Sequence, residues 1–184
     1  MYVQPALIIP SLVRRYIAWT ERGVVQRCVE LDIADLQNWT RTPEPVPGTE
    51  ILPLPACGRE WMISRLHNES FFDSPGYRPA TPLHVIALRA APYHDPRAIF
   101  VARAGRRCVG FCIGRNRPNG RGLVNGLGVQ PAFRGQGIAR SLLRTTLCYL
   151  KEQGATEALI RVHPDNTPAI RLYWSEGFIE RQVR

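Results

Sequence analysis

The stretch QPAFRGQGIARSLL, residues 130–143, places Gly135 and Gly137 in a turn between an apolar, strand-like run and an apolar, helix-like run. Glycine tolerates left-handed backbone conformations and lets a ligand approach the main chain closely. The first N–H groups of the following helix have no partner inside the helix, and the positive end of the helix dipole lies beside them. Such a turn attracts phosphate, and Arg134 and Arg140 would add positive charge. We therefore predict a phosphate site here, with a turn that holds no ligand as the alternative.

A second group of polar residues lies in RVHPDNTPAIRLYWSEGF, residues 161–178. Asn166 follows the end of a predicted strand, and Tyr173 lies on the predicted helix that comes next. Each side chain also has a purely structural interpretation, Asn166 as the N-terminal cap of the helix and Tyr173 as a residue packed on the core. The glycine turn itself is neither a Walker loop nor a GxGxxG fingerprint, so it indicates little without this second group.

The cysteines favour neither a metal site nor a disulfide. They are an odd number scattered through apolar patterns, which indicates reduced thiols in the core. The five are Cys28, Cys57, Cys108, Cys112 and Cys148. Cys108 and Cys112 have the wrong spacing for the usual zinc knuckle, and no Cys or His lies close to them in sequence. No metal is therefore predicted.

The elements that must position the polar residues follow from the period of the apolar residues. Helical periodicity is found in residues 57–72, 81–92, 137–154 and 167–177. Strand-like runs are residues 49–55, 98–105, 106–115, 120–130, 157–163 and 178–183. Turn signals between the runs that start at residues 98, 106 and 120 predict an antiparallel meander. The glycine turn thus joins the last strand of the meander to an amphipathic helix.

The N-terminal part is organised differently. Residues 40–48, TRTPEPVPG, alternate three prolines with other residues, which predicts an extended linker. We divide the chain into an N-terminal extension with this linker, residues 1–48, and a main domain, residues 49–184. A strand from Val24 to Leu31 is predicted to fill the outer edge of the sheet, in its own chain or in that of a second copy, so a homodimer stays open. The alternative is a remnant of a preceding domain.

Charge and hydropathy limit the partners. The 184 residues carry a formal net charge of +9 and are 45% hydrophobic, which suits one globular domain with an appended segment. A cationic protein suits nucleic acid or a phosphate-bearing small molecule. The arginines are spread along the chain except for a cluster at Arg115, Arg117 and Arg121, so nucleic acid is the less favoured partner. Steeply salt-dependent retention on DNA or RNA would indicate the opposite.

The apolar runs are short. None approaches the roughly 18 residues that a membrane span needs. The opening residues also lack the basic start and cleavage site of a signal peptide. We therefore expect a cytoplasmic protein without a membrane partner.

Taken together, the two polar groups resemble a known signature. The first motif is R-x-x-G-x-A, formed by Arg134, Gly137 and Ala139 after LGVQP. The second is N-x-x-A-x-x-x-Y-x-x-x-G-F, formed by Asn166, Ala169, Tyr173, Gly177 and Phe178. In this order and after a meander, they resemble the acetyl-CoA signature of the GNAT superfamily of N-acetyltransferases, over residues 50–183. The N-x-x-F of Asn68 and Phe71 is similar to that of mycothiol synthase-like members.

The resemblance implies a fold and a set of roles. The fold would be α+β in three layers, with a mixed, mostly antiparallel sheet of six or seven strands, four flanking helices and a V-shaped opening between strands four and five. The backbone N–H groups of the turn would hold the pyrophosphate of acetyl-CoA, the only cofactor implied. These are the amides of Arg134, Gly135, Gln136, Gly137, Ile138 and Ala139.

Further roles implied by the resemblance lie on the strand and on the last helix. Leu127 to Val129 would pair with the pantetheine arm, helped by glycines on either side of Leu127. The Leu127 N–H would polarise the thioester carbonyl. Asn166 would bind the pantetheine, and Tyr173, with an ordinary pKa near 10, would protonate the leaving thiolate.

The sequence departs from the family at the general base. Many GNAT enzymes have a glutamate four residues before the position of Leu127, where this chain has Leu123. We choose His163 as the substitute, and Asn125 could hold a relay water. The alternatives are His67, His84 and Glu69. The expected reaction is direct attack of a small-molecule or peptide amine in a ternary complex. Because the usual base is missing, a non-catalytic acyl-CoA-binding sensor is the alternative function.

Overall fold

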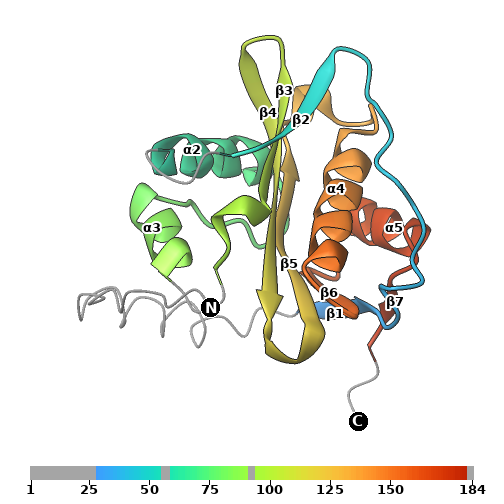
Figure 1. The fold of residues 1–184 in the computed structure, drawn as a ribbon. Helices are drawn as coiled ribbons and strands as arrows, with labels where there is room; N and C mark the ends of the chain where they lie inside the picture. Colours follow the sequence, from blue (N-terminus) through green and yellow to red (C-terminus); the bar gives the residue numbers. More distant parts are fainter. Residues whose placement is uncertain (1–27, 55–58, 91–93, 182–184) are drawn as a thin grey trace.

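The computed structural model describes residues 28–54, 59–90 and 94–181. The strands are β1 (Val29–Ile33), β2 (Thr49–Pro53), β3 (Ile99–Ala104), β4 (Arg107–Arg117), β5 (Arg121–Val129), β6 (Glu157–Val162) and β7 (Ile179–Glu180). The α-helices are α2 (Glu60–Phe71), α3 (Pro82–Ala90), α4 (Ile138–Glu152) and α5 (Thr167–Ser175). The strands form one sheet in the order β2-β3-β4-β5-β6-β1-β7. Helices α2 and α3 cover one face, and α4 and α5 cover the other (Figure 1).

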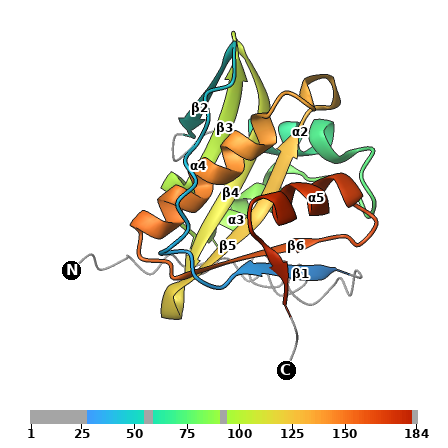
Figure 2. The ribbon, with the colours of Figure 1, turned by 90° about the vertical axis from the view of Figure 1, so that its right-hand side faces the viewer.

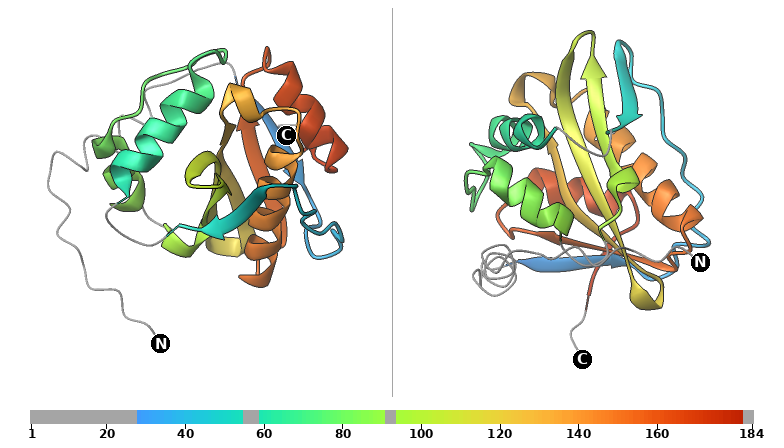
Figure 3. Two further views of the ribbon diagram at one scale, coloured as in Figure 1. Left: turned by 90° about the horizontal axis from the view of Figure 1, so that it is seen from above. Right: turned by 60° about the vertical axis from the view of Figure 1, so that its left-hand side comes forward.

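The predicted meander is confirmed. Strands β2 to β5 pair antiparallel with their neighbours, and only β5 and β6 run parallel. A parallel pair needs a crossover connection, which α4 provides. The sheet is thus mixed and mostly antiparallel, as the resemblance implied, and its three layers are seen end-on in Figure 3.

The core on the α4 face follows from the stripe of apolar residues along this helix. Ile138, Leu142, Leu143 and Leu147 are at most 1% exposed and belong to one cluster with buried residues of β5 and alternate residues of β6. A smaller core lies on the other face, between β3, β4 and the helices α2 and α3. The helix that follows the glycine turn is therefore held rigidly on the sheet (Figure 2).

The predicted N-terminal strand differs in position and bounds. It is observed as Val29–Ile33, and it lies between β6 and β7 rather than at the outer edge. Residues 24–27 lie outside the described residues. Leu31 and Ile33 pack in the α4 core, and the short β7 pairs with the other side of β1 and takes the edge.

The proline-rich segment is extended, and it runs beside α4 from β1 to β2 (Figure 2). Ser141 Oγ donates to the Glu44 carbonyl at 2.9 Å, and Arg144 Nη1 donates to the Thr42 carbonyl at 3.1 Å. Residues 28–48 thus share the core of the rest of the chain, while the division at residue 48 stays a prediction. None of the described helices is both long enough and apolar enough to cross a membrane.

Candidate functional site

The opening of the sheet begins at Asn125. Strand β5 pairs with β6 only from Arg121 to Val124, against Glu157 to Ile160. At Asn125 the register with β4 also shifts by one residue, which is a β-bulge. A bulge bends its strand, so the second half of β5 leaves β6 behind. If the N-terminal β1 is left out of the count, β5 and β6 are the fourth and fifth strands. The V-shaped opening therefore lies between the two strands that the resemblance implied.

The backbone of Leu127 faces this opening. The Gln130 N–H donates to the Val109 carbonyl at 2.9 Å, on the β4 side. Successive residues of a strand point their polar groups to opposite sides. The N–H groups of Leu127 and Val129 therefore point away from β4, toward the gap left by β6. They are placed to receive an extended ligand as an additional strand.

The glycines beside Leu127 serve a different purpose from the one expected. A Cβ on Gly128 would lie 2.9 Å from Ser70 Cβ and 3.0 Å from the rings of Phe71 and Phe111. These atoms belong to the α2 face and not to the opening. Gly128 therefore allows α2 to pack closely on β5, whereas a Cβ on Gly126 would meet Phe111 at an ordinary 3.5 Å.

The turn of residues 134–139, here named the phosphate turn, has the predicted backbone. Gly135 and Gly137 have φ angles of 76° and 84°, in the left-handed region that favours glycine. Gly137 caps α4 without a side-chain hydrogen bond. The Arg134 N–H, which the resemblance also implied for the pyrophosphate, donates instead to the Pro131 carbonyl at 3.2 Å. Within the described residues, the amides from Gly135 to Arg140 have no hydrogen-bond partner. Residues 134–137 are exposed, so these amides and the helix dipole fit a pyrophosphate group.

Among the side chains of the phosphate turn, Gln136 is exposed, Ala139 is half-buried and Ile138 is 1% exposed. Ile138 can therefore contact a ligand through its backbone but not through its side chain. The Arg140 guanidinium reaches Glu176 at 2.9 Å, from Nε to Oε1. The Arg134 guanidinium forms an ion pair with Asp73, which raises the pKa of Arg134. Both arginine charges are thus partly neutralised by carboxylates.

Tyr173 lies in the core beside the strand that carries Leu127. It is 5% exposed, and its ring packs on Phe178 with the centroids 5.8 Å apart. Burial raises its pKa well above the ordinary value, and the nearby Cys112 thiol contributes in the same direction. Tyr173 and Cys112, the register partner of Leu127, belong to the same core cluster, and Leu127 packs against it. The phenol keeps its proton at neutral pH, and its raised pKa makes it a weaker acid than an ordinary tyrosine.

Asn166 caps α5. Its Oδ1 accepts the Ala169 N–H at 3.3 Å, which is the structural role considered for it above. The Nδ2 group forms no hydrogen bond within the described residues. The cap therefore leaves one polar end of Asn166 for a ligand.

His163 follows β6, but its lone pair is engaged. The Asp165 N–H donates to His163 Nδ1 at 3.3 Å. In a neutral imidazole, a lone pair on Nδ1 leaves the proton on Nε2. The carboxylate of Asp165 also lies near this nitrogen, with Oδ2 at 3.7 Å from Nδ1. Asn125 is exposed at the bulge, and Leu123 is buried on the paired half of β5, where it lines a pocket with Leu159 and Arg161.

His67, one of the alternatives, has the opposite tautomer. The backbone N–H of Ala80 donates to Asn68 Oδ1 at 2.7 Å, and Asn68 Nδ2 donates to the Ala80 carbonyl at 2.9 Å. These bonds fix the oxygen of Asn68 toward His67 Nδ1, 3.4 Å away, so Nδ1 must donate. The lone pair is left on Nε2. Burial lowers the pKa of His67, which keeps the ring neutral near pH 7.

The other two alternatives are engaged in the structure. Glu69 accepts from Gln130 Nε2 at 2.6 Å and from Arg65 Nε at 2.7 Å. His84 Nδ1 accepts the Thr81 N–H at 2.9 Å.

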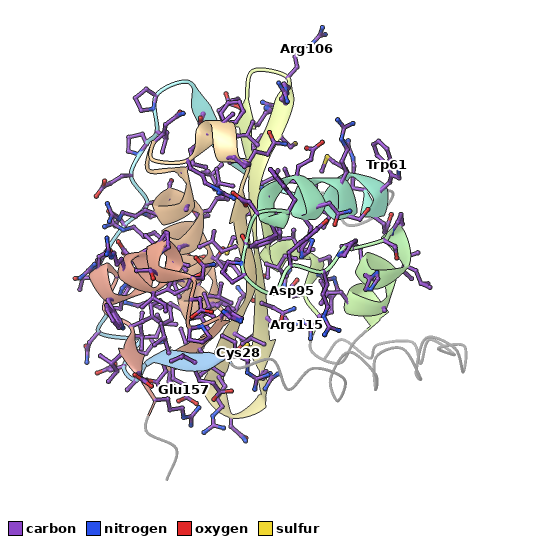
Figure 4. All side chains as sticks on the ribbon, turned by 180° about the vertical axis from the view of Figure 1, so that it is seen from behind. Cys28, Trp61, Asp95, Arg106, Arg115 and Glu157 are labelled. Atoms are coloured by element: carbon purple, nitrogen blue, oxygen red, sulfur yellow. The ribbon has the colours of Figure 1, made fainter. Side chains whose placement is uncertain are left out.

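Arg115, from the arginine cluster of the sequence, lies beside α3 and is labelled in Figure 4. Its Nη2 donates to the carbonyl of Leu88 in α3 at 3.3 Å. No cluster of three metal-binding side chains is found in the described parts of the chain.

One buried carboxylate beside the helix of Tyr173 was not predicted from the sequence. Glu176, with its side chain 1% exposed, receives Arg140 and Arg144 from α4, each at 2.9 Å, and Arg41 from the linker at 3.6 Å. It follows α5 and so connects the helix that carries Tyr173 to α4. The four-residue spacing of Arg140 and Arg144 was a signal for one shared partner, but nothing in the sequence named the partner.

Comparison with known proteins gives a consistent picture. The family model described as acetyltransferase (GNAT) family matches residues 61–178. A mycothiol acetyltransferase of Thermomonospora curvata is 33% identical over 123 residues, which are 67% of this chain and 41% of that protein. One of Geodermatophilus obscurus is 28% identical over 179 residues, which are 94% of this chain and 57% of that protein. The chain thus spans about half the length of these relatives.

A solved structure shares the fold. The crystal structure of a GCN5-related N-acetyltransferase from Sphaerobacter thermophilus superposes with a TM-score of 0.72 at 24% identity. The match covers 84% of this chain and 48% of that one. The arrangement of sheet and helices is therefore one already seen in acetyltransferases.

Proposed function

The chain belongs to the acetyltransferase (GNAT) family, and we propose that it transfers an acetyl group from acetyl-CoA to an amine. The observation that carries this proposal is the opening beside β5, where the Leu127 N–H faces the gap and the partner-free amides of the phosphate turn follow at its end. One donor lies where a thioester carbonyl would bind, and a row of donors lies where a pyrophosphate would bind.

The proposed reaction is a direct transfer. The neutral amine attacks the thioester carbonyl, the carbon–sulfur bond breaks, and the nitrogen gives up a proton to a base. The Leu127 N–H donates to the carbonyl oxygen as negative charge develops on it. Tyr173, held protonated by burial, gives its proton to the coenzyme A thiolate. The Nδ2 group of Asn166 contacts the pantetheine, and the Val129 N–H pairs with it as a strand would.

His67 is the better candidate for the base. Its lone pair is free on Nε2, while that of His163 is occupied by the Asp165 N–H. His67 also lies among the rings of Phe71 and Phe111, which pack on the β5 glycines beside Leu127. A water held at Asn125 would relay the proton. The comparison of His67→Gln with His163→Gln tests this, because only the first is expected to lose the acidic limb of the pH–rate profile.

The acceptor is proposed from the relatives. Two similar proteins carry the name mycothiol acetyltransferase, so an amine related to mycothiol is the first acceptor to examine. We propose that the acceptor reaches Leu127 from the side of α2 and the residues after it, up to Thr81, because α2 packs on the neighbouring Gly128. A cytoplasmic location is part of the proposal, since the described cysteines are free thiols.

A second candidate function rests on Leu123. An apolar side chain replaces the usual base, so a protein that binds acyl-CoA without turnover is the competing proposal. A protein that only binds acyl-CoA does not need a residue that protonates the leaving thiolate. Tyr173→Phe separates the two functions, because an enzyme loses turnover at unchanged coenzyme binding.

The first experiment is calorimetric titration of the protein with acetyl-CoA, followed by an amine screen with thiol detection. We expect binding, weakened in Gly137→Val because that backbone is left-handed. We expect Tyr173→Phe to reduce turnover by about 100-fold or more while binding is retained. Absence of acetyl-CoA binding would contradict both functions, and equal loss of binding and turnover in Tyr173→Phe would contradict its role as the acid.

A further inference from the structure

The side chain of Arg134 leaves the phosphate turn and binds the segment that follows α2. Its Nη1 lies 2.6 Å from Asp73 Oδ2, and its Nη2 lies 2.8 Å from Asp73 Oδ1. Two parallel bonds of this kind match the planar fork of arginine to a carboxylate. The pairing lowers the pKa of Asp73, which stays ionised at neutral pH.

Two backbone carbonyls hold the same guanidinium in place. Arg134 Nε donates to the Val129 carbonyl at 3.1 Å, and Nη2 donates to the Ser70 carbonyl at 2.9 Å. An isolated surface ion pair contributes little, and here the two side chains are 42% and 38% exposed. The two carbonyls make this ion pair stronger than an isolated one. They fix the orientation of the guanidinium, so less side-chain entropy is lost when Asp73 binds to it. One side chain thus joins the end of β5, the end of α2 and the segment beyond.

The segment from Phe72 to Thr81, here named the acceptor loop, is held at both ends. Near its start, Asp73 binds Arg134. Near its end, Ala80 forms two hydrogen bonds with the side chain of Asn68 on α2. Between them, the ring of Tyr77 stacks on His67 with the centroids 6.4 Å apart. The position of this loop relative to the phosphate turn therefore depends on Asp73.

We propose that Asp73 is a positioning residue that couples occupancy of the phosphate turn to the acceptor loop. An anion held by the turn amides fixes the backbone of Arg134, and the guanidinium then holds the loop against the site. By linkage, a loop held by Asp73 favours the anion in return. The consequence, which rests on the proposed function, is that acetyl-CoA prepares the acceptor side before the amine binds.

The test measures hydrogen exchange of the amides in residues 72–81 with and without coenzyme A. In the wild type, saturating coenzyme A is expected to slow this exchange by about 5-fold or more, the lower range of known coupling. In Asp73→Asn, coenzyme A still binds by calorimetry, but the slowing is lost. Arg134→Lys is the second variant, because it keeps the charge and removes the fork. Both variants should raise the acceptor KM more than they change kcat.

Glu50→Gln is the matched control. It breaks the ion pair of Arg103 with Glu50, whose atoms lie 2.6 Å apart on the β2–β3 pair, away from the loop. This variant should respond to coenzyme A as the wild type does. Equal slowing in the wild type and in Asp73→Asn would overturn the inference and leave the proposed function standing. A wild type that fails to bind coenzyme A would overturn both.

Discussion

Burial determines the chemistry of Tyr173. A phenol in water has a pKa near 10, and removal from water disfavours the phenolate, so the hydroxyl in the core keeps its proton. The raised pKa also makes the phenol a weaker acid than an ordinary tyrosine. The transfer proposed for it therefore requires that the same removal from water makes the accepting thiolate more basic.

This burial has a consequence for stability at high pH. A folded-state pKa raised above the unfolded value means that the folded protein binds the proton more tightly. The contribution of Tyr173 is therefore fully present below pH 10 and is lost as the pH rises above it. We expect the free energy of unfolding to fall more steeply between pH 9.5 and about 11 in the wild type than in Tyr173→Phe. Urea unfolding measures this.

The comparison is controlled within the chain. Tyr149 and Cys112 each have a pKa raised to about 12, so both contribute a loss in the same pH range. Tyr149 does so equally in the wild type and in Tyr173→Phe. Cys112 is coupled to Tyr173, so the difference between the two proteins reports on this pair of groups. Parallel pH curves for the two proteins would show that Tyr173 titrates normally.

At the scale of elements, the contact of α2 with β5 depends on a single glycine. Gly128→Ala is expected to push Ser70 away and to reduce stability by about 1–3 kcal/mol, the usual result of overpacking. Gly126→Ala lies two residues away on the same strand and meets only an ordinary contact, so its effect should stay below about 1 kcal/mol. Chemical denaturation of both variants checks this, and equal effects would contradict the packing argument.

A second pair of elements, α4 and α5, is joined through Glu176. The carboxylate is buried and receives Arg140, Arg144 and Arg41. Glu176→Gln leaves Arg144, only 11% exposed, without its buried partner, and we expect a loss of about 3 kcal/mol. Glu152→Gln, on the exposed end of α4, is the control and should change little. Thermal unfolding that is the same for both variants would contradict a role for the buried cluster.

At the scale of the molecule, the N-terminal extension is part of the core. Leu31, Ile33, Leu36 and Trp39 are buried with the residues of α4, and Trp39 Nε1 donates to the Glu176 carbonyl at 3.0 Å. Each large core side chain stabilises a protein by about 2–5 kcal/mol, and the stability of a domain is only about 5–15 kcal/mol. A chain truncated to residues 48–184 should therefore lose cooperative unfolding. A truncated chain that melts cooperatively would show that β1 is dispensable.

Most of the fold could be predicted because it depends on local patterns. The period of the apolar residues placed α4 and the meander strands nearly at their observed ends, since burial of one face requires that period. The phosphate turn could also be predicted, because left-handed glycines before an amphipathic helix define the backbone locally. The two motifs together indicated the family that the comparisons show.

The tertiary structure alone decided what the polar side chains touch. No local pattern shows that β1 lies between β6 and β7, that Arg134 pairs with Asp73, or that Glu176 gathers three arginines. The choice between His67 and His163 likewise depends on which atom of each ring is already bonded. These contacts join residues far apart in sequence, and their energies depend on burial and geometry. The sequence by itself determined the left-handed glycine turn before α4, and only the folded chain decided which groups stand around it.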